Sequence, residues 1–238
     1  MALPRSRGPV IRIYPEPVTE EELGPLPAGR HGLSREEVSL NQRERLIGGL
    51  AEAVSEHGYN AVTITHITKI ARVSRRAFYE NFESKEDCFL AAFDIVVDHI
   101  RALSDEAVVP TEDWPHEVIA AFRSTLSFLA AEPDLARLCL VDSLGAGPMV
   151  AQRFQETVYG FTPLLARGRS LRESDRPLPD STENSLVGAL VNLASRSIIA
   201  GEAEQLERLL PDFVEFALAP YLGAEEARRL AGEATANT

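Results

Sequence analysis

Two short helix patterns lie close together between residues 63 and 85 and leave room for only a tight turn between them. In the first pattern, a favourable N-cap is followed by apolar residues at helical spacing: Thr63, then Ile64, Ile67, Ile70 and Ala71. In the second, Ser74 is placed to cap a helix whose Phe78 and Phe82 share one face. The segment therefore predicts a helix–turn–helix.

The outward face of the second short helix is the candidate functional surface. It presents Ser74, Arg75, Arg76 and Tyr79. A helix that begins with two arginines suits the major groove of DNA, because the N-terminal residues of such a helix meet base edges and phosphates. The pattern therefore predicts DNA binding.

The chain resembles the DNA-binding unit of the TetR (tetracycline-repressor-like) transcriptional regulators over roughly residues 41–102. The residues that match the family pattern are Thr63, Ile67, Ala71, Val73, Ser74, Tyr79, Phe82, Ser84, Lys85 and Glu86. Three positions depart from it: Thr68 stands where Ala is usual, Arg72 where Gly is usual, and Asn81 where His is common. A left-handed conformation at Arg72 would cost about 1 kcal/mol relative to glycine.

The resemblance implies an all-α chain with an N-terminal three-helix helix-turn-helix DNA-binding domain and a C-terminal helical domain for effector binding and dimerisation. We expect DNA contacts from the first helix, the two short helices and the start of the fourth. The expected contact residues are Arg43, Thr63, Thr65, Ser74, Arg75, Arg76, Ala77, Tyr79 and Lys85.

The chain divides into three regions. Residues 1–39 hold six prolines and little periodicity, which is typical of a mobile extension; whether Arg30 there contacts DNA or the segment merely enters the fold stays open. Residues 40–85 form the DNA-binding domain, which continues into a fourth helix to about residue 103, and residues 104–238 form the ligand-binding and dimerisation domain. Apolar periodicity predicts further helices over residues 40–57, 84–103, 115–131, 133–145, 149–167, 182–201, 204–222 and 224–231.

The net charge of −12 is unevenly distributed. Residues 30–85 carry nine Lys/Arg against seven Asp/Glu, whereas residues 86–238 carry twelve against twenty-five. The candidate DNA-facing segment is therefore mildly basic on an acidic body. The sequence shows no apolar run near 18 residues, no apolar signal-peptide stretch at its start and only two cysteines, so we expect a cytoplasmic protein with no membrane partner.

Sequence patterns for catalysis are missing. The chain has no Gly-rich phosphate loop, no nucleophile elbow, no zinc spacing of Cys and His, and no His pair at i, i+4. We therefore expect no enzyme activity, no catalytic residues, no metal and no cofactor. Two alternatives to a DNA-binding regulator stay open: a helical protein–protein adaptor of the same fold that does not bind DNA, and a small helical enzyme that uses a C-terminal cavity.

The resemblance also implies a C-terminal cavity for a small effector. Its apolar wall candidates are Phe93, Phe122, Leu126, Leu138, Phe154 and Phe161. Three polar residues within otherwise apolar helices, Asp142, Asn192 and Arg196, are candidates to contact the ligand. Alternatively, Arg196 pairs with an acidic residue or lies at the surface. The mostly apolar lining favours a hydrophobic or aromatic effector.

The last two long helices resemble the dimerisation pair of the family. The expected interface residues are Leu186, Leu190, Leu193, Phe213 and Phe216. The resulting hypothesis is a homodimeric repressor of a palindromic double-stranded DNA operator, released by a small-molecule effector.

Overall fold

The computed structural model describes residues 35–107, 113–172 and 176–236 of the chain. These ranges contain helices and connecting segments but no strand, which confirms the predicted all-α class. The α-helices are α1 (Arg35–His57), α2 (Ile64–Ala71), α3 (Arg75–Asn81), α4 (Lys85–Ala107), α5 (Trp114–Ala131), α6 (Pro133–Arg137), α7 (Pro148–Gly160), α8 (Thr162–Ala166), α9 (Thr182–Ile199), α10 (Leu210–Leu222) and α11 (Ala224–Ala236). The shorter helical segments are η1 (Tyr59–Ala61), η2 (Leu138–Asp142), η3 (Ser143–Gly145), η4 (Arg167–Leu171) and η5 (Ala203–Leu209).

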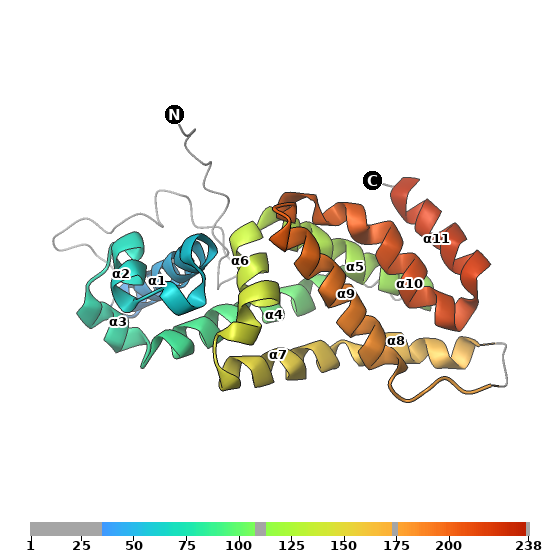
Figure 1. The fold of residues 1–238 in the computed structure, drawn as a ribbon, viewed down its shortest axis with the longest axis horizontal. Helices are drawn as coiled ribbons and strands as arrows, with labels where there is room; N and C mark the ends of the chain where they lie inside the picture. Colours follow the sequence, from blue (N-terminus) through green and yellow to red (C-terminus); the bar gives the residue numbers. More distant parts are fainter. Residues whose placement is uncertain (1–34, 108–112, 173–175, 237–238) are drawn as a thin grey trace.

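Figure 1 shows two groups of helices connected by α4. The helices α1, α2 and α3 cluster at one end, and α5 to α11 form the larger body. Helix α1 begins at Arg35, so residues 35–39 are helical and do not belong to the predicted extension. Residues 1–34, which carry the rest of that prediction, lie outside the described residues.

The small N-terminal group is built on a core that the sequence predicted. The side chains of Leu50, Ile67, Phe78 and Phe82 are buried there. Burying each such side chain is worth about 1.5–3 kcal/mol. Helix α1 crosses α2 at Gly49, where an added Cβ would lie 2.9 Å from the main-chain oxygen of Ile67. Glycine is therefore the residue that allows this close approach.

The larger body departs from three of the predicted helices. The helix expected over 133–145 is divided into α6, a π-helical η2 and a 3-10 turn η3, and the buried Ser143 hydroxyl donates to the Cys139 carbonyl at 2.7 Å. Prolines explain the other two breaks. Pro163 lies in the first turn of α8 and Pro211 in the first turn of α10, and proline favours that position. The tail helix α11 extends past the predicted residue 231.

A polar network fixes α9 against the far end of the body. Arg169 donates to both carboxylate oxygens of Glu183, at 2.8 and 2.7 Å, and the Tyr221 hydroxyl donates to the same carboxylate at 2.8 Å. The hydrogen bond from Arg169 is the main reason that the pKa of Glu183 is lowered. Trp114 packs edge-on against Tyr221, and an added Cβ at Gly168 would collide with Trp114.

Glu132, at the junction of α5 and α6, gives a pH-dependent prediction. Burial, with a smaller contribution from Asp134, raises the pKa of this carboxyl from 4.5 to about 7. Its protonated form favours folding, so this contribution is fully present below pH 4.5 and is lost as the pH rises through 7. At pH 8 the Glu132 carboxyl is charged in a partly buried position, which destabilises the fold. We therefore expect Glu132→Gln to raise the free energy of unfolding at pH 8 by about 1–3 kcal/mol, a range that allows for solvent screening of this partly exposed side chain.

Urea unfolding of the wild type and the variant at pH 5 and pH 8 checks this result. Glu225→Gln on the exposed side of α11 makes the same charge change and serves as the control. An equal effect of the two substitutions at pH 8 would contradict the assignment to Glu132.

Candidate nucleic-acid interface

The predicted helix–turn–helix is present, with both predicted N-caps. The Thr63 hydroxyl accepts from the His66 amide and the His66 ring accepts from the Thr63 amide, each at 3.3 Å. The Ser74 hydroxyl accepts from the Ala77 amide at 3.0 Å. Arg72, which replaces the usual turn glycine, adopts the left-handed conformation with φ 53° and ψ 42°.

The exposed side of α3 carries most of the residues predicted for DNA contact. Ser74, Arg75, Arg76 and Tyr79 are exposed, with 54% of Tyr79 accessible. Ala77 is buried beside Phe78, so the prediction that it contacts DNA was wrong. It lies next to Phe78, on the inner side of α3, whereas the arginines lie on the exposed side.

Arg76 is held only at the surface. Its Nε donates to Glu80 at 2.8 Å, and 88% of the Arg76 side chain is exposed. The hydrogen bond to Glu80 raises the pKa of Arg76. Exposed pairs one helical turn apart are weak, so Arg76 is free to exchange Glu80 for an anionic ligand.

Two predicted DNA contacts instead bind main-chain carbonyls of their own domain. Arg43 donates to the Asn81 carbonyl at 3.2 Å, and its guanidinium lies 4.4 Å from the ring centroid of Phe82. Lys85 donates to the carbonyls of Tyr59 at 2.7 Å and of Val62 at 2.8 Å, and burial lowers its pKa. Both side chains therefore have structural roles that the sequence analysis missed.

Arg45 of α1 is a functional candidate that was not among the predicted contact residues. Its guanidinium donates to the carbonyl of Ala71, and to that of Arg72 at 2.8 Å. Burial, and then the nearby Arg72 charge, lower the pKa of Arg45. No local sequence signal announces this contact, because its acceptors are main-chain atoms 26 and 27 residues away.

The start of α2 lies beside this surface. Thr63 and Thr65, both predicted contacts, are exposed there, and so are Lys69 and Arg72 farther along. The first turn of α2 contains no acidic residue. A helix N-terminus of this kind attracts anions, including the phosphates of a nucleic acid.

Asp142, a predicted effector residue, lies where the larger body meets the N-terminal helices. Its carboxylate is 3.5 Å from Arg137 and lies against the backbone of Tyr59. Burial raises the pKa of Asp142, which Arg137 and the Tyr59 backbone partly oppose. It therefore takes part in the contact between the two groups of helices, and its predicted contact with an effector stays a prediction.

Asn192 and Arg196, two other predicted effector residues, are exposed on α9. The apolar candidates lie inside the body: Phe93, Leu126, Leu138 and Phe154 are buried, whereas Phe122 and Phe161 are half-buried. The rings of Phe93 and Phe154 have centroids 6.3 Å apart. The Thr157 hydroxyl, on the same helix as Phe154, is buried without a hydrogen-bond partner.

Some of the predicted dimer residues are buried within the chain and others are partly exposed. Leu186, Leu190 and Phe213 are buried in the core of their own chain, so they were wrong as interface residues. Leu193 is half-buried, and 49% of Phe216 is exposed. The outward side of α9 consists mostly of small or polar residues: Ser185, Gly188, Ala189, Asn192 and Arg196.

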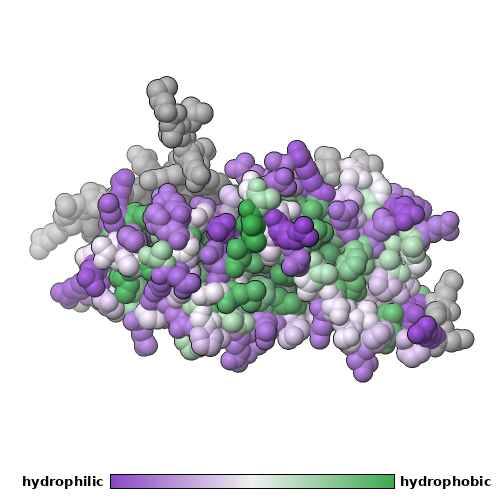
Figure 2. All heavy atoms as spheres, in the orientation of Figure 1, coloured by the Kyte–Doolittle hydropathy of each residue, from purple (hydrophilic) through white to green (hydrophobic). Residues whose placement is uncertain are grey.

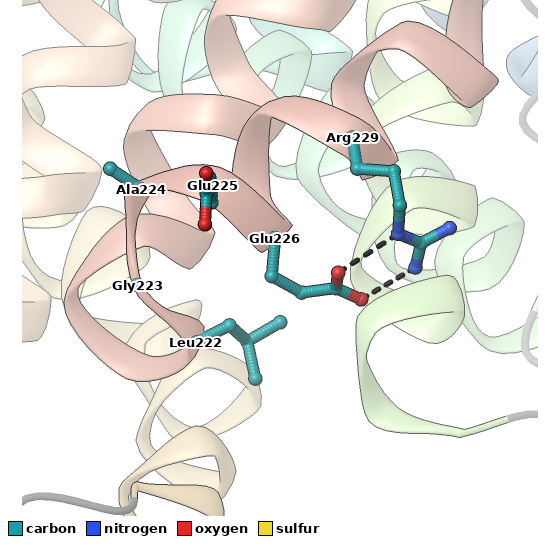
Figure 3. A pocket seen from close by; sticks show the side chains of 6 residues that line it. All are labelled: Leu222, Gly223, Ala224, Glu225, Glu226 and Arg229. Carbon is teal, nitrogen blue, oxygen red and sulfur yellow. Dashed lines mark hydrogen bonds and ion pairs between the residues drawn. The ribbon is translucent and has the colours of Figure 1, made fainter.

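A surface groove is present where α10 turns into α11 (Figure 3). It is lined by Leu222, Gly223, Ala224, Glu225, Glu226 and Arg229, none of which was predicted to bind a ligand. Glu226 and Arg229, both on α11, hydrogen-bond to each other beside it. Within residues 35–107, 113–172 and 176–236, no group of three or more His, Cys, Asp or Glu side chains is arranged to hold a metal ion. In the same ranges, no helix combines the length and the apolar character needed to cross a membrane.

Comparison with known proteins identifies the helix–turn–helix. Residues 46–92, from within α1 to within α4, match the family model for bacterial regulatory proteins of the tetR family. The N-terminal group of helices is similar to the DNA-binding unit of TetR-family transcriptional regulators. The TetR-family match covers the buried core of the N-terminal group together with the exposed arginines of α3, and it confirms the resemblance found in the sequence.

Similar proteins include bacterial transcriptional regulators. AcuR of Cereibacter sphaeroides is 30% identical over 109 residues, which are 46% of this chain and 49% of AcuR. The transcriptional repressor AcnR of Corynebacterium diphtheriae is 24% identical over 193 residues, 77% of this chain and 94% of AcnR. The chain thus spans about half the length of several curated relatives that it matches.

Among solved structures, the fatty acid degradation regulator FadR of Bacillus halodurans has the same fold. The two superpose with a TM-score of 0.62 at 20% identity, over 76% of this chain and 95% of FadR. The similarity supports the arrangement of a helix–turn–helix followed by a larger helical body.

Proposed function

We propose that this chain is a homodimeric repressor that binds a palindromic DNA operator and is released by a small hydrophobic effector. The observation that carries the proposal is the exposure of Arg75, Arg76 and Tyr79 on α3, above the buried Ala77 and Phe78. Arginine side chains at the start of such a helix are suited to pair with guanine in the major groove. We also propose residues 35–85 as the DNA-binding domain and the rest, after α4, as the domain for effector and partner.

Contacts to the DNA backbone would fix the register of α3. Thr63 and Thr65 at the start of α2 supply hydroxyl groups and the positive end of a helix, and Lys69 and Arg72 add exposed charge. Contacts of this kind position a protein on the duplex without reading its sequence. The acidic remainder of the chain opposes indiscriminate DNA binding, so the operator contact depends on this small basic surface.

The outward side of α9 and the neighbouring Phe216 of α10 form the proposed dimer surface. Figure 2 shows hydrophobic side chains gathered in the middle of one side of the molecule, around α6 and α9. Ile199 is 64% exposed, and Gly188 and Ala189 allow another helix to approach closely. Two copies related by a twofold axis would present two α3 helices to half-sites about 34–36 Å apart, or a multiple of that distance.

A single substitution tests the dimer surface. Ala189→Arg places a charged side chain on the exposed side of α9, away from the core of the protomer. We expect it to convert a dimer into a monomer of 26.1 kDa in sedimentation velocity. Gln155→Arg on the exposed side of α7 should leave the dimer intact. If the Ala189→Arg variant keeps the mass of a dimer, the interface does not lie on this side of α9.

The interior between α4 and α7 is the proposed effector site. Phe93 and Phe154 supply an aromatic, apolar surface, and the unpaired hydroxyl of Thr157 offers one polar contact. Helix α4 continues from this region to Lys85 at the edge of the helix–turn–helix. An effector that binds a shifted arrangement of α4 more tightly would weaken operator binding, and a 100-fold change needs a difference of about 2.7 kcal/mol.

Selection of duplexes from a random library by the purified full chain tests the proposal. We expect enrichment of an inverted repeat that is bound with salt-dependent affinity. Failure to enrich any duplex would favour the alternative, a helical protein–protein adaptor of this fold that does not bind DNA.

A further inference from the structure

We propose that Arg43 and Arg45 of α1 are positioning residues, which hold the ends of α3 and α2 on α1 and so set the direction in which α3 points. This inference rests on the proposed function, since the helix that they position is the proposed reading helix. Neither arginine needs to touch DNA for this role.

Arg45 acts at the C-terminal end of α2. Its guanidinium donates to the Ala71 and Arg72 carbonyls, the second at 2.8 Å. The last carbonyls of a helix lack hydrogen-bond partners within the helix and carry the negative end of its dipole. A guanidinium at this end donates hydrogen bonds to these carbonyls and places a positive charge against the dipole. Arg72 adopts the left-handed conformation that favours glycine. Arg45 therefore stabilises a turn whose own residue is poorly suited to it.

Arg43 acts at the C-terminal end of α3. It donates to the carbonyl of Asn81, the last residue of the helix, at 3.2 Å and stacks on the Phe82 ring at 4.4 Å. The Asn81 side chain binds back to the Ala77 carbonyl at 2.8 Å, and the Ser39 hydroxyl of α1 donates to Asn81 at 3.3 Å. The side chains of Ser39, Arg43, Asn81 and Phe82 thus meet where α3 ends.

The two arginines reach different helices because they lie two residues apart on α1. Side chains with this spacing do not share a helix face. Arg45 therefore reaches the end of α2, and Arg43 reaches the end of α3. The angle between α2 and α3 is thus set by these contacts with α1 as well as by the short turn at residues 72–74. A reading helix needs this second layer of support, because small displacements lose base contacts.

The experiment compares Arg43→Ala and Arg45→Ala in the full chain with Arg228→Ala, which removes one charge from exposed α11. Two quantities are measured: affinity for the selected duplex as a function of salt, and hydrogen exchange of α2 and α3 amides without DNA. We expect each of the first two variants to lose about tenfold or more in affinity. We also expect an unchanged salt slope and faster exchange at the affected helix end, with part of the loss restored in Arg43→Lys and Arg45→Lys.

Other outcomes overturn the inference. A salt slope reduced by about 0.9 with unchanged exchange would assign the arginine to a phosphate contact. Unchanged affinity and unchanged exchange would leave it without a positioning role. If the wild-type chain binds no duplex, the proposed function is wrong, but this result does not test the positioning role of the two arginines. Hydrogen exchange of the free protein still decides whether the arginines hold α2 and α3, and the lysine variants provide folded samples if an alanine variant unfolds.

Discussion

Replacing Gly49 with valine is expected to destabilise the helix–turn–helix by about 3 kcal/mol, at the upper end of the usual cost of overpacking. An added Cβ would lie 2.9 Å from the Ile67 oxygen and 3.1 Å from the Ala71 nitrogen. Both are main-chain atoms of α2, so neither is able to rotate away, and α1 would have to separate from α2. Operator binding should fall more than 100-fold, because α3 is placed through this contact.

Gly48 provides a matched control for this substitution. It precedes Gly49 on the same helix, but an added Cβ there would meet nothing within 4 Å. Gly48→Val is therefore expected to leave stability nearly unchanged, since valine has a slightly better helix propensity than glycine. Urea unfolding followed by circular dichroism checks the pair. Equal stabilities of the two variants would contradict the described packing of α1 on α2.

Replacing Arg75 with alanine is expected to weaken operator binding by about 10–100-fold, or 1–3 kcal/mol, with no loss of stability. Arg75 is exposed at the start of α3, where side chains of a helix–turn–helix meet base edges. Arg76→Ala should cost about 1–3 kcal/mol if that residue also contacts a base. A loss confined to certain operator positions would identify a base contact, and a uniform loss with a lower salt slope would identify a phosphate contact.

Gel-shift titration with the selected duplex and with single-position variants of it measures these effects. Arg228→Ala, which removes an exposed charge from α11, is the control. Unchanged affinity after Arg75→Ala would remove this residue from the interface.

Local signals in the sequence were enough to predict the helix–turn–helix. The N-caps Thr63 and Ser74 and the left-handed Arg72 depend on neighbours within a few residues, and each is present in the structure. Arg43 and Lys85 were different, because their acceptors are main-chain carbonyls from distant segments, and any carbonyl is an acceptor whatever its residue type. No residue pattern reveals such a pairing.

Apolar spacing also did not distinguish the core side of α9 from its outward side. Leu186 and Leu190 form an apolar stripe that fits a dimer interface as well as the core of a single chain, and the structure places them in the core. The outward side carries Gly188 and Ala189, whose small size gives little signal in a hydrophobic pattern. The break after Arg137 was missed for a related reason, since residues 138–142 continue as a π-helix without a proline or glycine to mark the change.

The central claim is that the exposed arginines of α3 read a specific duplex. The most direct test is to measure the affinity of the wild type and of the Arg75→Ala, Arg76→Ala double variant for a selected and a scrambled duplex, between 50 and 200 mM salt. We predict that the wild type prefers the selected duplex and binds more weakly as salt rises, and that the double variant loses this preference while remaining folded. Equal affinity of the wild type for both duplexes, or a preference that survives the double substitution, would contradict the claim.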